Sequence, residues 1–183
     1  MTDAADGGHT GGADTSSVRG TASGLVVREA STTDAGALVY LRALMFGAMG
    51  TDPHLLEDPG WRQAAHGWFV DHVGVAEVRL VVAEVDGEVV AGAVGEVTSL
   101  IPGPGTVNGS VGLISNVATL PEHRGRGLAS AVTDDLLAWF AERTDVTRVD
   151  LFATSEGSRI YAPRGFTVRG FPAMSLPVPR GRS

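Results

Sequence analysis

The hydrophobic residues of this chain follow two spacings, and the change between them predicts an order of strands and helices. Leu38, Leu41, Met45 and Ala48 recur every three or four residues, which predicts a helix that begins near the capping residues 31–33. The same spacing predicts helices over 61–73 and 127–144, and a short helix at the start of 157–166. Runs rich in β-branched residues predict strands over 25–30, 78–100 (two strands joined by a turn at Asp86-Gly87), 110–120, 146–154, 166–171 and 173–178.

These elements describe one domain of mixed α/β class. Residues 1–24 are rich in Gly, Asp, Thr and Ser, so we expect a disordered tail before a single domain over 25–180. The interval 52–60 contains Pro53 and Pro59 and is expected to be a loop. The uncharged span 97–121 is interrupted by prolines and glycines, so a membrane-spanning helix is not expected there.

Composition narrows the kinds of function that we expect. The net charge of −7 argues against nucleic acids or anionic membranes as the main partners. The chain contains no Cys, which excludes disulfides, thiolate zinc sites and Cys nucleophiles and agrees with a cytoplasmic location. Its five His show no metal-ligand spacing, so no metal is predicted. All fourteen basic residues are Arg, a bias typical of GC-rich bacterial coding.

The stretch PEHRGRGLAS, residues 121–130, joins a predicted strand to a predicted helix through a turn that contains two glycines. The first amides of a helix have no partner within the helix and lie at the positive end of its dipole. Gly125 and Gly127 carry no Cβ, so an anion can approach their backbone closely, and Arg124 and Arg126 add positive charge. This combination suits a pyrophosphate group.

Three other interpretations of this stretch differ in what they require. A P-loop requires Gly-Lys-Ser/Thr, and the absence of Lys excludes it. A dinucleotide-binding turn requires a third glycine and an early position, whereas Ser130 stands in the third place and the stretch follows a predicted antiparallel hairpin. A basic surface turn that only starts a helix stays open on this stretch alone.

A second stretch, ATSEGSRIYAPRGF at residues 153–166, changes this interpretation. Together the two stretches resemble the GNAT superfamily of N-acetyltransferases. The first fills that family's R/Q-x-x-G-x-G/A signature with Arg124, Gly127 and Ala129. The second fills its L-Y-x-x-x-G-F signature with Ile160 in the Leu place, then Tyr161, Gly165 and Phe166. The resemblance covers about residues 25–178, and the predicted order of elements agrees with it.

The resemblance implies an α+β fold in which a mixed, mostly antiparallel sheet is flanked by helices and a splayed strand holds acetyl-CoA. The amides of 125–129 would hold the pyrophosphate, and the strand residues 116–119 would pair with the pantetheine arm. Many family members carry Asn where Thr154 stands, which reduces the hydrogen-bonding capacity there. The implied donor-binding residues are Asn116, Val117, Ala118, Thr119, Arg124, Gly125, Arg126, Gly127, Leu128, Ala129, Ser130 and Thr154.

The resemblance also implies two candidate catalytic residues. Tyr161 matches the family's tyrosine, whose hydroxyl would protonate the leaving thiolate; the alternative is that Tyr161 only packs. Glu96 lies in the predicted hairpin, where many family members carry a carboxylate base; the alternative is an outward-facing surface Glu. A backbone N–H near Val117 or Ala118 would stabilise the negative charge on the carbonyl oxygen.

The acceptor is expected between the first two helices and the hairpin. Candidate acceptor-binding residues are Arg42, Phe46, Met49 and Trp68, for which a place in the core is the alternative. We therefore predict a cytoplasmic N-acetyltransferase that acts on a small-molecule amine, without metal, nucleic-acid or membrane partners, in a fold compatible with a homodimer. The alternatives are a non-catalytic acyl-CoA-binding or sensing domain of the same fold and a dinucleotide-binding module.

Overall fold

A computed structural model of the chain describes residues 24–154, 157–170, 173–176 and 178. Apart from Gly24, the tail expected over 1–24 lies outside the described residues. The strands are β1 (Leu25–Glu29), β2 (Val78–Val85), β3 (Glu88–Ser99), β4 (Ser110–Thr119) and β5 (Val149–Leu151). The α-helices are α1 (Ala35–Ala48), α2 (Pro53–Glu57), α3 (Pro59–His72), α4 (Leu128–Arg143) and α5 (Ser158–Tyr161). Single 3-10 turns are η1 (Thr32–Asp34), η2 (Pro121–His123) and η3 (Ala162–Arg164).

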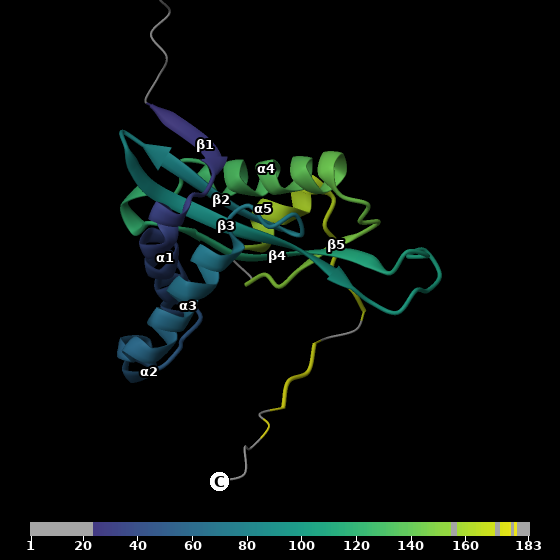
Figure 1. Ribbon diagram of the computed structural model, residues 1–183, viewed down its shortest axis with the longest axis horizontal. Coiled ribbons are helices and arrows are strands. Elements are labelled where there is room, and N and C mark those ends of the chain that lie inside the picture. Colours follow the sequence, from purple (N-terminus) through teal and green to yellow (C-terminus); the bar gives the residue numbers. More distant parts are fainter. Residues whose placement is uncertain (1–23, 155–156, 171–172, 177, 179–183) are drawn as a thin grey trace, which may run out of the picture.

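The strands form one sheet in the order β1-β2-β3-β4-β5 (Figure 1). The first four strands pair antiparallel with their neighbours, and β5 pairs parallel to β4. The hairpin predicted at Asp86-Gly87 joins β2 to β3, and both turn residues have positive φ, 52° and 87°. The predicted class, a mixed and mostly antiparallel sheet flanked by helices, is therefore confirmed.

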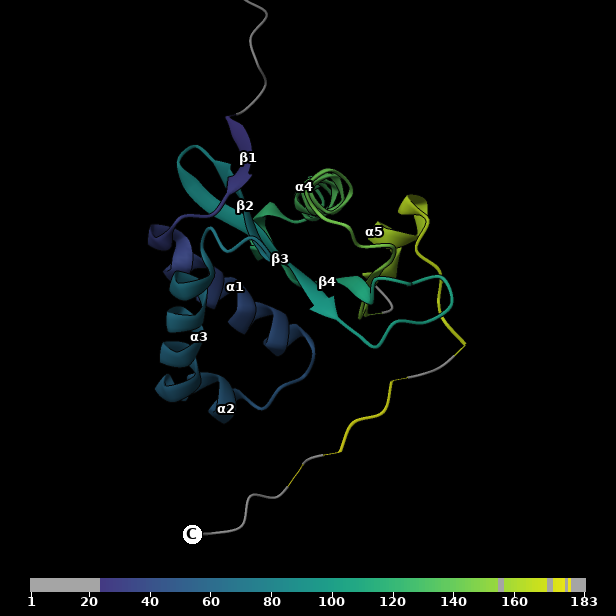
Figure 2. The same cartoon turned by 45° about the vertical axis from the view of Figure 1, so that its right-hand side comes forward.

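Two glycines of β3 show which helices cover each face of the sheet. A Cβ added to Gly95 would lie 3.0 Å from Leu136 of α4, and one added to Gly92 would lie 2.9 Å from Leu38 of α1. Helix α4 therefore packs on one face, and α1 with α3 on the other, as Figure 2 shows. Only residues without a side chain allow both layers to approach this closely.

The core has one apolar cluster on each face of the sheet. Val132 and Leu136 of α4 are fully buried on one face, and Leu80 and Val94 are buried with α1 and α3 on the other. The four-residue spacing of Val132 and Leu136 in the sequence thus marks the face of α4 that packs on the sheet. This packing holds the ends of α1 and α4 against the same strand, β4, where the candidate site lies.

The two closing strands expected over 166–171 and 173–178 are not present among the described residues of that segment. The strand expected over 146–154 is shortened to β5, Val149–Leu151. An apolar alternation forms a strand only where a face is buried and a neighbour accepts its backbone, and here Val168 and Met174 are almost fully exposed. Proline, which lacks the N–H that a ladder requires, stands at 172 and 177.

The loop expected over 52–60 is also wrong, because it contains α2 and the start of α3. Both prolines lie in first helical turns, where their missing N–H costs nothing. The Asp before each proline caps the helix: Asp52 accepts from the His54 amide at 2.9 Å, and Asp58 from the Gly60 amide at 2.8 Å. Among the described residues, no helix has the length and apolar character needed to cross a membrane.

Candidate functional site

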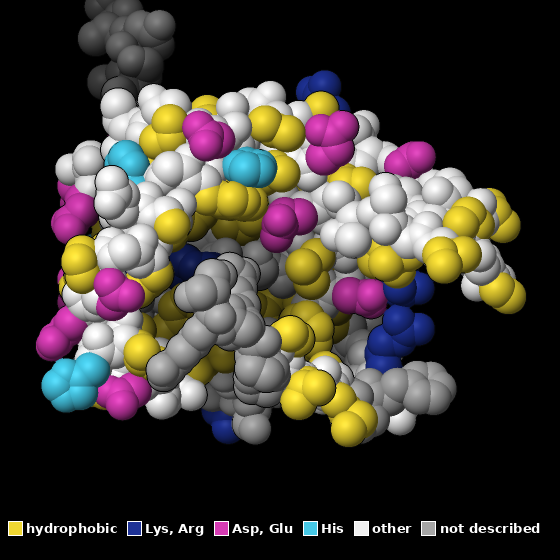
Figure 3. Space-filling model, turned by 60° about the horizontal axis from the view of Figure 1, so that its bottom comes forward, with side chains coloured by type: hydrophobic (Ala, Val, Ile, Leu, Met, Phe, Trp, Pro, Cys, Tyr) yellow, Lys and Arg dark blue, Asp and Glu magenta, His cyan; other side chains and the backbone are white. Residues whose placement is uncertain are grey.

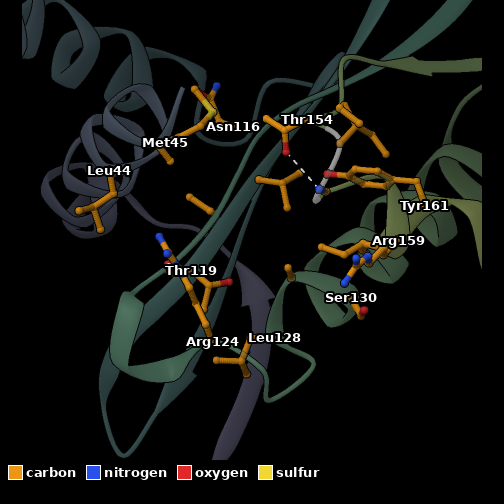
Figure 4. Close-up of a pocket in the computed structure, with 18 of the residues that line it drawn as sticks. Leu44, Met45, Asn116, Thr119, Arg124, Leu128, Ser130, Thr154, Arg159 and Tyr161 are labelled. Atoms are coloured by element: carbon orange, nitrogen blue, oxygen red, sulfur yellow. Dashed lines mark hydrogen bonds between the residues drawn. The ribbon is translucent and has the colours of Figure 1, made fainter. Parts of the chain in front are cut away.

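A cavity of about 640 Å³ lies where β4, the start of α4, helix α5 and the last turn of α1 meet. Its volume is in the range of sites that bind small molecules and cofactors. Seen from below in Figure 3, the molecule is hollowed on this side, and hydrophobic side chains surround the hollow. Figure 4 shows its walls: Thr119, Arg124 and Leu128 on one side, Tyr161 and Arg159 from α5 on the other.

The glycine turn before α4 leaves open space beside its backbone. Gly125 and Gly127 have φ of 73° and 79°, and an added Cβ at either position would meet no atom within 4 Å. Positive φ explains glycine here, and the open space means that a ligand group can approach the amides at the start of α4. Gly127 is the N-cap of α4 and makes no side-chain cap, so the first-turn amides are available to an anion.

The arginines of this turn differ in position. Arg124 lines the cavity and donates from Nε to the Thr119 carbonyl at 3.3 Å. Arg126 contacts His123 Nδ1 at 3.1 Å and is not among the lining residues, although His123 is. Of the two basic residues predicted for a phosphate, the structure thus brings Arg124 to the cavity and turns Arg126 toward its neighbour.

The edge of β4 is free beside the cavity. β5 pairs only with Gly112 to Ile114, so from Ser115 to Thr119 the edge of β4 that faces away from β3 has no strand partner among the described residues. The register with β3 shifts at the same place, and Asn116 has φ of 54°, which produces a bulge. The predicted splayed segment 116–119 therefore lines the cavity along an edge with which no described strand pairs.

Thr119 adds a further unmet polar group. Among the described residues, Thr119 Oγ1 is the one buried side-chain oxygen or nitrogen atom that has no hydrogen-bond partner. A buried polar atom without a partner costs free energy, about 1–3 kcal/mol. Because Thr119 lines the cavity, a polar ligand bound there would remove this cost.

Tyr161 lies on α5, and Figure 4 shows its side chain extending across the cavity toward β4, hydroxyl foremost. The residue is buried and its ring packs edge-on against Phe166, with 5.8 Å between centroids. Burial raises the pKa of Tyr161, and the positive charge of Arg164 opposes that rise in part. The phenol is therefore protonated at neutral pH, as a proton donor must be.

Arg164 connects the helix of Tyr161 to α4. Its Nε and Nη2 contact the two Asp134 carboxylate oxygens at 2.5 and 2.7 Å. Nη1 donates to the Ile160 carbonyl at 2.6 Å, and Nη2 also reaches the Ser130 carbonyl at 3.3 Å. One guanidinium thus joins the residue before Tyr161 to the first turn of the helix that begins at the glycine turn.

Thr154, in the place of the family's Asn, has a local role. Its Oγ1 accepts from the Gly157 amide at 3.1 Å, and both residues line the cavity (Figure 4). This bond forms the turn that leads into α5. The hydroxyl keeps its own proton to donate to a ligand.

The acceptor-side predictions fall into two groups. Met49 lines the cavity, whereas Phe46 packs edge-on against Trp61 and Trp68 stacks on His72 at 4.0 Å. Arg42 donates to Asn116 Oδ1 and lies 4.7 Å over the Phe46 ring. Glu96 is half-buried on β3, outside the cavity lining but close enough to act electrostatically on Arg42.

Sequence reasoning missed several lining residues. Helix α1 contributes Leu44 and Ala48, the segment after β5 contributes Phe152, and α5 contributes Arg159. Phe152 is 81% exposed, although it directly follows the half-buried strand β5. The helical spacing of α1 shows that one face is apolar, but it does not show which part of that face extends beyond the core.

A family model and a solved structure both indicate one family for this chain. A family model described as "Acetyltransferase (GNAT) family" matches residues 45–166. The solved structure of a GCN5-related N-acetyltransferase from Ralstonia eutropha is 27% identical, with a TM-score of 0.74 over 85% of this chain and 99% of that chain. No curated protein matches the sequence significantly.

Two further structures share the fold at lower identity. A predicted acetyltransferase with acetyl-CoA from Clostridium acetobutylicum is 22% identical, with a TM-score of 0.73 over 83% of this chain and 96% of that chain. An aminoglycoside N-acetyltransferase in complex with CoA is 14% identical, with a TM-score of 0.67 over 86% of this chain and 97% of that chain. Since the family model spans more than half of the sequence and the fold agrees, the chain belongs to the GNAT family of acetyltransferases.

Proposed function

We propose that this protein is an N-acetyltransferase that moves an acetyl group from acetyl-CoA to the amine of a small molecule within a ternary complex. The observation that carries the proposal is one cavity that runs from the glycine turn before α4 to the Tyr161 hydroxyl. The overall reaction forms one C–N bond and breaks one C–S bond. The amine loses one proton and the thiol product carries one.

The residues of the cavity fit the two ends of an acyl-CoA. Gly125 and Gly127 leave room for a pyrophosphate at the start of α4, and Arg124 supplies a positive charge. The free edge of β4 offers backbone groups to the two amides of a pantetheine arm, and Thr119 Oγ1 is a buried hydroxyl that lacks a partner. Bound acetyl-CoA would supply an acyl group that is activated as a thioester.

The chain's own groups supply the rest of the chemistry. A backbone N–H of Val117 or Ala118 can donate to a carbonyl oxygen that gains negative charge. The protonated Tyr161 hydroxyl can donate to the departing sulfur. Because Glu96 does not line the cavity, we propose that it accepts the proton of the amine through water rather than directly.

A thermal-shift and turnover experiment tests this function. At one hundred times its dissociation constant, acetyl-CoA stabilises the folded protein by about 2.7 kcal/mol, which corresponds to a rise in Tm of about 5–10 °C for a chain of this size. We expect this rise with acetyl-CoA and none with NAD, and consumption of acetyl-CoA with at least one class of amine. An equal rise with NAD would indicate a dinucleotide-binding module, and a rise without turnover would indicate a non-catalytic acyl-CoA-binding domain.

A further inference from the structure

Arg42 carries a positive charge that no acidic side chain contacts among the described residues, as is also true of Arg124 and Arg159 in the cavity lining. Among the described residues it forms no ion pair, although it is half-buried. Burial lowers its pKa, and the charge of Glu96 opposes this only in part. The arginines that do contact a carboxylate are Arg28, Arg79, Arg148, Arg164 and Arg169.

The guanidinium of Arg42 lies directly behind the cavity wall, in contact with a lining residue. It donates to Oδ1 of Asn116, the residue at the β4 bulge that lines the cavity, and the ring of Phe46 supports it from below. Arg42 comes from α1, the helix whose last turns form the cavity wall opposite α5.

The neutral amide oxygen of Asn116 accepts from only one of the N–H groups of the Arg42 guanidinium. The group has five N–H donors in a planar fork, and that fork matches the two oxygens of a carboxylate. Among the described residues, Arg42 makes one hydrogen bond, the one to Asn116. Partial desolvation without a matching anion is costly, and a carboxylate brought by a ligand would offset that cost.

Glu96 adds the opposite charge at the same place. The Cβ positions of β3 alternate, and Gly92 and Val94 face α1 and α3, so Glu96 faces that layer as well. Its charge acts on Arg42, yet the two do not form an ion pair. A positive group and a negative group that act on one another without contact match a molecule that carries both charges.

We propose that the acceptor is a small amino acid or a closely related amino carboxylate, whose carboxylate binds Arg42 and whose ammonium group is drawn toward Glu96. This inference rests on the proposed acetyltransferase function and names the class of its acceptor. It also gives Asn116, which lines the cavity, a role: its side chain accepts a hydrogen bond from the Arg42 guanidinium and orients it. Amines that lack a carboxylate would leave Arg42 without an anionic partner and would bind less well.

Matched acceptors test the proposal. Glycine, alanine, methionine and phenylalanine are each compared with the corresponding primary amide and with the corresponding amine that lacks the carboxyl group. In the wild-type protein we expect kcat/KM for at least one amino acid to exceed that for its amide by about tenfold or more. In Arg42→Gln this ratio falls to about one, and Arg42→Lys, which keeps the charge but not the fork, retains an intermediate preference.

Arg62 provides the matched control. It is also half-buried, it lies 5.2 Å over the Trp61 ring, and it donates to a neutral oxygen, the Leu56 carbonyl at 2.9 Å. Neither arginine lines the cavity itself, but Arg42 bonds to the lining residue Asn116, whereas Leu56 does not line the cavity. Arg62→Gln should keep the wild-type preference for the amino acid. The Tm and the affinity for acetyl-CoA of each variant show whether the fold and the donor site are intact.

The outcomes separate this inference from the proposed function. Equal or better turnover of amides and simple amines by the wild-type protein overturns the inference and leaves acetyl transfer standing. A preference for amino acids that persists in Arg42→Gln, with folding intact, also overturns it. Absence of turnover with every amine, although acetyl-CoA binds, overturns both.

Discussion

The contacts of Arg164 predict that a residue outside the cavity lining controls the position of Tyr161. Replacing it by Met keeps an apolar stem but removes the two contacts with Asp134 and the two hydrogen bonds to the carbonyls of Ser130 and Ile160. The Asp134 side chain is 58% exposed, so the ion pair itself contributes only about 0.5–1 kcal/mol. The hydrogen bonds from a charged, largely buried donor bring the total for Arg164→Met to about 2 kcal/mol.

This loss should affect catalysis more than donor binding. Helix α5 has four residues, so Arg164 is a large part of what holds it against α4. We expect kcat to fall by about tenfold, since small displacements of a reacting group are costly, while the affinity for CoA changes less. Removing the positive charge should also raise the pKa of Tyr161 and shift the alkaline limb of the kcat profile to higher pH.

Steady-state kinetics, CoA titration and amide hydrogen exchange in α5 measure these effects. Asp134→Asn removes only the exposed ion pair and should cost about 0.5 kcal/mol with little change in kcat. Arg148→Met is the control, because Arg148 pairs with Asp150 at 3.0 Å and is not among the residues lining the cavity. Equal kcat values for Arg164→Met and Arg148→Met would refute a positioning role for Arg164.

Three further predictions concern the donor turn, the proton donor and the fold. Gly127→Glu should abolish binding of acetyl-CoA in calorimetry, because it places a negative side chain in the open space beside the α4 amides and strains a φ of 79°; unchanged affinity would locate the anion site elsewhere. Tyr161→Phe should lower kcat at least tenfold with little change in the dissociation constant of acetyl-CoA, and equal turnover would remove Tyr161 from the acid role. Asp34 contacts Arg28 at 2.8 Å, and its pKa is lowered from 3.8 to about 2. This lowering stabilises the fold by about 2 kcal/mol above pH 3.8, and the contribution is lost as the pH falls toward 2. Chemical denaturation of Asp34→Asn should therefore show a deficit of that size at pH 7 that vanishes near pH 2, and a deficit independent of pH would contradict the assignment.

The sequence correctly predicted the turns and helices that depend on residues adjacent, or three to four positions apart, in the chain. The turn at Asp86-Gly87 needs two residues with positive φ, and the sequence provides residues that adopt it. The donor turn at 121–130 is equally local, because a strand, two glycines and a helix start are contiguous in the chain. Helices α1 and α4 follow from apolar spacing, within one or two residues at α4.

The wrong predictions share a physical cause. The expected strands over 166–171 and 173–178 and the expected loop over 52–60 depended on residue types without knowledge of what surrounds them. A strand requires a neighbour to pair with, and a proline ends a helix only when it does not stand in the first turn. Neither condition can be read from spacing alone.

By itself, the sequence determined the class of fold, the family and the position of the glycine turn before α4, because each depends on short patterns that can be read along the chain. Only the tertiary structure decided which side chains share the site. The free edge of β4 depends on where β5 stops pairing, and the contact between Arg42 and Asn116 joins residues 74 positions apart. Arg164 likewise meets Asp134 across 30 positions. Such contacts arise from the packing of whole helices against the sheet, and no local pattern in the chain encodes them.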